Sequence, residues 1–116
     1  MARPDFHGLC SADIYPLSAK AGQIDRDYLF HLLLSPGFTE YANGGSARAG
    51  MPKVNRDHLF SFRVHLPSVA KQKPLAAMLD ALHSETQRLE SIYQNKLVAL
   101  DALKKSLLHQ AFSGAL

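Results

Sequence analysis

The sequence has very little of what secreted and membrane proteins require. Its single cysteine, Cys10, excludes a disulfide within the chain. The sequence contains no run of 18 or more apolar residues, which is the length that a membrane-spanning helix needs. Its amino terminus lacks the charged start, apolar run and cleavage site of a secretory signal. We therefore expect a cytoplasmic protein with no membrane partner.

Catalytic motifs are equally scarce. The sequence has no glycine-rich phosphate loop and no paired cysteines, and its six histidines never fall at a metalloprotease spacing. Neither the cofactor pocket of a methyltransferase nor the carboxylate cluster of a nuclease is recognisable. Asp25 and Asp27 stand where a helix starts, which favours a capping role over chemistry. We expect no enzymatic activity, no metal and no cofactor of the chain's own.

The charge surplus is small, and its position matters more than its size. The formal net charge is +3 at pH 7, which many proteins that bind no nucleic acid also carry. Between Asn43 and Arg56, however, three basic residues occur without any acid, next to glycines that let backbone amides approach a phosphate. The candidate DNA contacts are Ser46, Arg48, Lys53, Asn55 and Arg56. The alternative is an ordinary solvated loop.

The last third of the chain carries a heptad pattern. Alternating steps of four and three residues define a seam, of which eight of ten positions are apolar: Leu75, Leu79, Leu82, Thr86, Leu89, Tyr93, Lys96, Leu100, Leu103 and Leu107. Polar residues at single seam positions, here Thr86 and Lys96, typically fix register or partner choice. The pattern favours a coiled coil over the alternative, a core helix of a small domain.

This helix is predicted to span residues 74–113. Pro74 suits its first turn, and Ser113 with Gly114 supplies its end. We expect a homodimer through the seam, with parallel and antiparallel pairing both open. The predicted anchors of the dimer or partner interface are Leu79, Leu82, Leu89, Tyr93, Leu100, Leu103 and Leu107.

Residues 1–70 are predicted to form an α+β globule with a thin core. Asp25 should cap a helix that ends before Ser35-Pro36, a second helix should cover residues 38–42, and Asn55 should cap one further turn. Three extended segments complete the prediction: strands at residues 9–17 and 60–66, and a short one at 51–54. The fold class expected is therefore α+β, followed by a long carboxy-terminal coiled-coil helix.

Four stretches carry a resemblance to a known family: GLCSADIYPL, DRDYLFHLLLSPGF, GMPKVNRDHLFSFRVHLP and LVALDALKKSLLHQAFSGAL. They resemble the specificity subunit of type I restriction-modification systems. More narrowly, they look like the carboxy-terminal part of one target recognition domain followed by the helical spacer that ends it. The similarity covers residues 8–116, and the KKSLLHQAFSG ending after the heptads is its most specific part.

The resemblance implies a non-catalytic role in a restriction system. In that family the subunit has two tandem halves, each a recognition domain plus a long helix; the two helices pair antiparallel, and each half reads one part of a bipartite target. The implied partners are double-stranded DNA, the methyltransferase subunit and the nuclease-translocase subunit. S-adenosylmethionine, Mg and ATP would belong to those partner subunits.

The sequence departs from the family in two ways. Where the family has a proline pair followed by Glu-Gln-Lys, Lys71 replaces the acid, although Gln72 and Lys73 agree. Family recognition domains are also about twice as long as residues 1–70, so the resemblance implies a truncated domain without its amino-terminal base-reading loops. Two functions stay open: a DNA-contacting specificity subunit, and a protein–protein module that assembles or obstructs the complex without recognising DNA.

Overall fold

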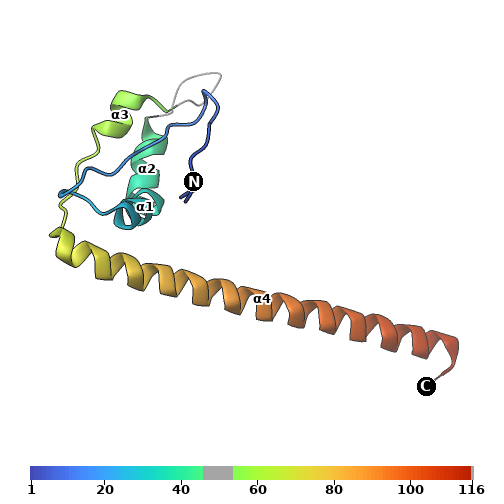
Figure 1. Ribbon diagram of the computed structural model, residues 1–116. Coiled ribbons are helices and arrows are strands. Elements are labelled where there is room, and N and C mark those ends of the chain that lie inside the picture. Colours follow the sequence, from blue (N-terminus) through green and yellow to red (C-terminus); the bar gives the residue numbers. More distant parts are fainter. Residues whose placement is uncertain (46–53, 116) are drawn as a thin grey trace. The chain divides into compact units, whose positions relative to one another are not determined.

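The computed structural model describes residues 1–45 and 54–115, and its regular elements there are four helices (Figure 1). They are α1 (Arg26–Leu34), α2 (Pro36–Gly44), α3 (Arg56–Phe60) and α4 (Val69–Ser113). The described residues fall into two units, Met1–Leu79 and Asp80–Leu116, so that α4 begins in the first unit and makes up most of the second.

The first two helices form where the sequence predicted them, because short polar side chains cap their ends. The Asp25 carboxylate accepts hydrogen bonds from the backbone N–H groups of Asp27 and Tyr28, at 3.1 and 3.2 Å. Ser35 ends α1 and caps α2, accepting from the Phe38 N–H at 3.3 Å, and Pro36 follows at the first helical position. One serine, Ser35, therefore separates the two helices.

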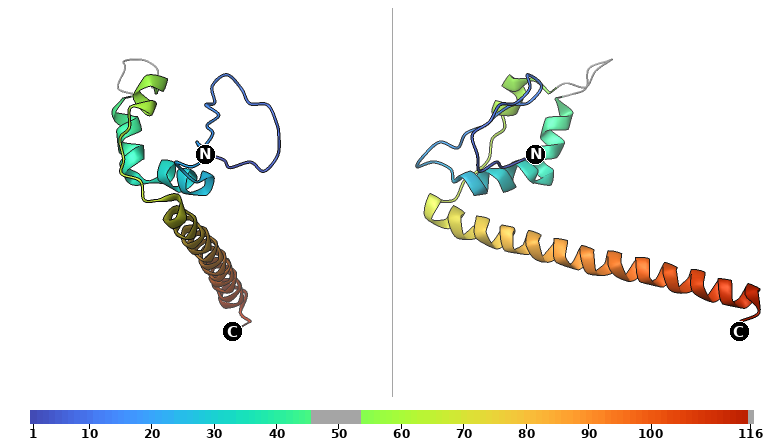
Figure 2. Two further views of the ribbon diagram at one scale, coloured as in Figure 1. Left: turned by 60° about the vertical axis from the view of Figure 1, so that its left-hand side comes forward. Right: turned by 45° about the vertical axis from the view of Figure 1, so that its right-hand side comes forward.

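The predicted α+β class is wrong, since the described residues contain no β-strand (Figures 1 and 2). Residues 9–17 form no strand, and Leu9 is fully exposed there. Phe60 ends α3, and residues 62–67 follow it without regular structure. The predicted extended segment at 51–54 lies, except for Val54, outside the described residues. Alternating apolar residues make a strand only when a second strand pairs with the backbone, and none of the described segments does so.

An aromatic cluster replaces the expected sheet between α2 and α3. The Tyr41 and His58 rings stack with centroids 4.2 Å apart, and each residue hydrogen-bonds the other's backbone carbonyl, at 2.7 and 2.8 Å. Phe62 packs its ring against Tyr41 and, edge to face, against Phe38. Gly45 is needed beside this cluster, because a Cβ there would lie 2.2 Å from the His58 ring.

The long helix α4 has 45 residues, roughly 67 Å at the usual rise per residue. It begins five residues before the predicted start, so Pro74 lies inside the helix and not at its first position. Its end is where the sequence placed it. Gly114 adopts a φ of +76°, and the Ala115 N–H donates to the Gln110 carbonyl at 3.0 Å, which is a Schellman closure.

Gln72 fixes the first turns of α4 to the rest of the first unit. Its side chain is fully buried and makes three hydrogen bonds to main-chain groups. Its Oε1 accepts from the Asp25 N–H at 2.7 Å, while its Nε2 donates to the carbonyls of Gln23 and Pro67, at 3.2 and 2.8 Å. Among the described residues only Gln72 and Ala76, one helical turn later, are buried. The thin core is therefore confirmed, and a polar side chain occupies its centre.

The amino-terminal segment is held to α1 by two arginines. Arg3 forms an ion pair with Asp27 at 2.9 Å and places its guanidinium 4.5 Å from the centre of the Phe30 ring. Arg26 hydrogen-bonds the Pro4 carbonyl. These contacts are partly exposed, so each contributes modestly to the stability of the first unit.

Candidate functional site

The seam of α4 is the most extensive candidate surface. All eight apolar seam residues are accessible, with exposed fractions between 41% for Leu79 and 64% for Leu82. Apolar flanking residues widen the stripe: Met78, Ile92 and Leu97. Of the 45 residues of α4, only Gln72 and Ala76 are buried, both in its first two turns. An accessible apolar stripe of this length favours a partner surface.

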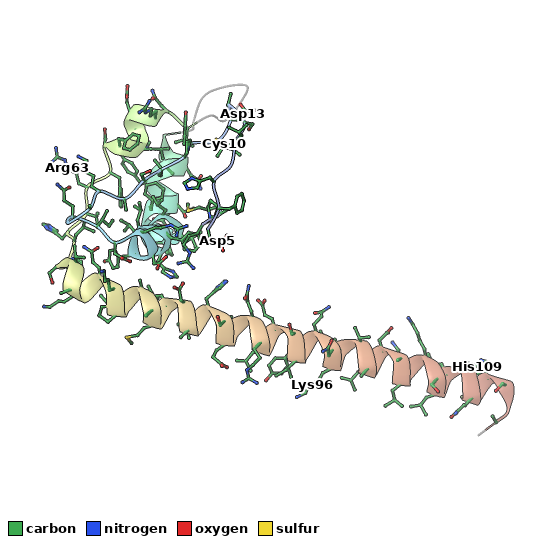
Figure 3. All side chains as sticks on the ribbon, viewed as in Figure 1. Asp5, Cys10, Asp13, Arg63, Lys96 and His109 are labelled. Carbon is green, nitrogen blue, oxygen red and sulfur yellow. The ribbon has the colours of Figure 1, made fainter. Side chains whose placement is uncertain are left out.

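The two polar seam positions are satisfied locally. The Thr86 hydroxyl donates to the Leu82 carbonyl one turn earlier at 2.9 Å, so it requires no outside partner. The Lys96 ammonium lies 5.3 Å from the centre of the Tyr93 ring, while its side chain extends away from the helix (Figure 3). Neither residue therefore prevents an apolar partner from approaching the leucines on either side.

Ion pairs lie at the edge of the seam and on the side of α4 away from it. Arg88 pairs with Glu85 at 3.0 Å, and Lys105 pairs with Asp101 at 2.8 Å. The side chains of both pairs are more than half exposed, so they add only a few tenths of a kcal/mol to the helix. Glu85 directly precedes the seam residue Thr86, so the edge of the apolar stripe carries a charge there, as is typical of coiled-coil flanks, whereas Asp101 and Lys105 lie on the side away from the seam.

The structure describes two of the five predicted DNA contacts. Asn55 caps α3, its Oδ1 accepting from the Asp57 N–H at 3.0 Å, and Arg56 places its guanidinium 5.6 Å from the Phe60 ring centre. Both residues are exposed and adjacent at the start of α3. Ser46, Arg48 and Lys53 lie outside the described residues. Whether the five form one surface therefore stays a prediction.

Sequence reasoning missed the role of Gln72. The polar hub that this residue forms is built from groups 47 and 49 residues away along the chain, and no local pattern encodes such contacts. The only sequence signal was that Gln72 agrees with the glutamine of the Glu-Gln-Lys stretch that follows the proline pair in the resembled family. Its position suggests that this agreement reflects the attachment of α4 and not ligand contact.

Two further properties bear on the chemistry of the chain. Within residues 1–45 and 54–115, no group of three or more His, Cys, Asp or Glu side chains could hold a metal ion. No helix in the same ranges is long and apolar enough to cross a membrane.

Comparison with known proteins finds a relative that fits these features. The chain is 32% identical over 111 residues to the type I restriction enzyme EcoDI specificity subunit of Escherichia coli. The match covers 96% of this chain and 24% of that protein, so the chain spans about a quarter of the relative's length. No family model and no solved structure matches. The resemblance to a type I specificity subunit is therefore confirmed.

Proposed function

We propose that the chain is a non-catalytic component of a type I restriction-modification complex in which α4 acts as spacer and assembly helix. The observation that carries this proposal is the accessible apolar seam of α4, in a chain that matches a specificity subunit over 96% of its residues. The proposal implies a cytoplasmic protein. Any S-adenosylmethionine, Mg or ATP chemistry is assigned to partner subunits.

The first partner in this proposal is a second copy of the chain. Two seams in contact would each bury their leucines, and each fully buried leucine side chain contributes about 1.5 to 3 kcal/mol before ordering costs. The first unit has only one buried apolar residue among those described, Ala76, so pairing of α4 would supply much of the apolar burial that the chain otherwise lacks.

The second partner is the methyltransferase subunit of the complex. The stripe on α4 is wider than a two-stranded seam needs, because Met78, Ile92 and Leu97 are also accessible. A helix that is apolar over so broad a face can contact two surfaces at once. We assign the flanks to the methyltransferase subunit and the seam to the second copy.

The third partner is double-stranded DNA, contacted by the basic segment that ends at Arg56. Phosphate contacts from arginine and lysine give affinity that falls steeply with salt, whereas reading a sequence requires several side chains held at base edges. The candidate residues support the first kind of contact. We therefore assign this chain weak binding without sequence preference.

Two measurements test these assignments. Binding of a fluorescent 30-base-pair duplex, followed by anisotropy at 50 and 200 mM salt, should show affinity at low salt that drops at least tenfold at high salt. Arg56→Ala should weaken it, while Lys105→Ala, on α4, should not. No binding at 50 mM salt would exclude DNA contact and favour the alternative, an assembly or obstructing module.

Copurification tests the assembly role independently of DNA. The full chain should copurify with a methyltransferase subunit of a type I system, and Leu97→Lys should reduce the yield because it places a charge on the flank of the stripe. Ser91→Lys, on the side of α4 away from the seam, is the matched control. A chain that fails to copurify under any salt condition would contradict the docking assignment.

A further inference from the structure

The longest stretch of the chain without an acidic residue includes the connection from α3 to α4. It covers residues 58–79, between Asp57 and Asp80, and contains three cations: Arg63, Lys71 and Lys73. All three residues are exposed, and the whole stretch belongs to the first unit. Positive charge is therefore concentrated on one part of the fold, with no acid of the same segment to offset it.

These three cations have no ion-pair or hydrogen-bond partner in the part of the chain that the structure describes. The ion pairs and cation–π contacts found there use other residues: Arg3, Arg56, Arg88, Lys96 and Lys105. Asp25 contacts Gln72 through its backbone N–H, but its carboxylate caps α1. Figure 3 shows Arg63 pointing outward from the first unit. The charges are accessible to an anion from outside the chain.

The stability of α4 does not account for its first two lysines. The amino terminus of a helix carries the positive end of the helix dipole, where acids are stabilising and cations are not. The first turn of α4 contains no acid, and Lys71 and Lys73 both lie within the first five residues of the helix. Lys71 even stands where the resembled family has an acid. A binding role explains charges that the helix itself disfavours.

We infer that Arg63, Lys71 and Lys73 form a basic strip that binds the phosphate backbone of duplex DNA. The inference rests on the DNA contact proposed above, and it adds a second set of residues to the segment that ends at Arg56. Arginine and lysine contacts to phosphates position a protein on a duplex without reading its sequence. The basic strip would therefore hold the start of α4 beside the DNA.

The side of α4 between the two lysines allows a duplex to approach closely. At about 100° per residue, Lys71 and Lys73 flank the buried Gln72, one on each side. Facing away from Gln72, between the lysines, are Ala70 and Pro74, both exposed. Short side chains leave room for a phosphate backbone against the helix, and the longer lysines can reach phosphates on either side of it.

The length of the basic strip fits several phosphates of one duplex. The five residues from Arg63 to Ser68 span at most about 18 Å, and Lys73 lies about 8 Å further along α4. A duplex carries one negative charge per roughly 1.7 Å of its axis. Over this length it presents more phosphates than the strip has cations, so all three cations can be neutralised by one ligand.

The salt dependence of DNA binding tests the basic strip in the full chain. The test variant carries Arg63→Gln, Lys71→Gln and Lys73→Gln, and both chains are titrated onto a fluorescent 30-base-pair duplex between 50 and 200 mM salt. The variant should bind at least tenfold more weakly at 50 mM. Its slope of log affinity against log salt should be shallower by about 2.7, because each phosphate contact contributes about 0.9. Circular dichroism should show unchanged helix content, since all three residues are exposed.

A matched control removes the same amount of charge elsewhere. Lys20→Gln, Lys104→Gln and Lys105→Gln together give the same net charge as the test variant and should leave the slope within about 0.5 of the original. An equal loss of slope in both triple variants would overturn the strip, because it would show an effect of net charge alone. A charge-conserving variant, Arg63→Lys with Lys71→Arg and Lys73→Arg, should keep the affinity within about twofold; a tenfold loss would contradict binding by charge.

The outcomes separate the basic strip from the DNA contact proposed above. An unchanged slope in the test variant, together with weaker binding of Arg56→Ala, would overturn the strip and leave that contact. No binding of the unsubstituted chain at 50 mM salt would overturn both. As a second measurement, poly-glutamate at equal charge should displace the labelled duplex at least tenfold less effectively than unlabelled duplex does. Equal displacement would indicate an acidic protein as the ligand and would overturn the assignment to DNA.

Discussion

The two units of the chain are stabilised in opposite ways. Met1–Leu79 is held by individual polar and aromatic contacts: the Asp25 cap, the Gln72 hub and the stacked Tyr41–His58 pair. In Asp80–Leu116 the contacts that the structure describes are local ones along a single helix, including two exposed ion pairs, and the helix presents an accessible apolar stripe. The first unit therefore depends on contacts within the chain, while the second offers the surface on which the proposed partner would pack.

The largest expected effect comes from breaking the second unit's seam. Leu100→Lys should weaken self-association at least 100-fold, because two buried leucines are lost from the dimer and two charges are placed in its core. Sedimentation velocity at a series of concentrations measures this. Ser91→Lys, which adds the same charge outside the seam, should leave association within about twofold. Normal dimers of Leu100→Lys would exclude the seam as the interface.

The first unit should respond most to loss of its polar hub. Gln72→Ala removes three hydrogen bonds to main-chain groups and should lower the free energy of unfolding by about 2 to 4 kcal/mol. Urea denaturation followed by tyrosine fluorescence measures the change. Gln94→Ala, at an exposed position of the same helix, is the control and should change stability by less than about 0.5 kcal/mol. Equal effects of the two variants would contradict the hub.

A smaller effect is expected at the end of α2. Gly45→Ala should destabilise the first unit by about 1 to 3 kcal/mol, because its new methyl group would clash with the His58 ring. The neighbouring Gly44→Ala meets no atom within 4 Å and should be neutral or slightly stabilising within the helix. Thermal unfolding of the two variants side by side checks the prediction, which fails if they have the same midpoint.

The smallest expected effect concerns the charge within the seam. Lys96→Glu should weaken self-association about three- to tenfold, because the cation–π contact with Tyr93 is lost and an acid is placed within the apolar seam. Lys96→Met, which keeps a long side chain without the charge, is the matched variant and should leave self-association unchanged or tighter. The measurement is self-association at low salt. Equal self-association of Lys96→Glu and the unsubstituted chain would show that Lys96 lies outside the interface.

Local signals explain which parts of the fold the sequence could predict. Asp25, Asn55 and the Ser113-Gly114 end act on backbone groups a few residues away, so their roles are encoded beside the helix ends they define. The seam of α4 was equally predictable, because its periodicity is a property of one continuous segment. In each of these cases the interacting groups lie within about two turns of the residue that specifies them.

Contacts between distant segments explain what the sequence did not predict. The alternation at residues 60–66 indicated a strand, but a strand requires a second one beside it; Phe62 instead packs on α2. Pro74 was expected at the first position of α4, yet the helix starts at Val69, where the Ser68 carbonyl accepts from the Lys71 and Gln72 N–H groups at 2.9 and 3.0 Å. Gln72, whose partners include Gln23 and Asp25, then secures those extra turns.

Sedimentation equilibrium of the intact chain at micromolar concentration tests the central claim most directly, namely that the seam of α4 pairs with a second copy. We expect the mass of a dimer, about twice the 12.8 kDa of one chain, and a return to the single-chain mass on substitution of Leu100 by lysine. A single-chain mass for the unsubstituted protein over the whole concentration range would contradict the account.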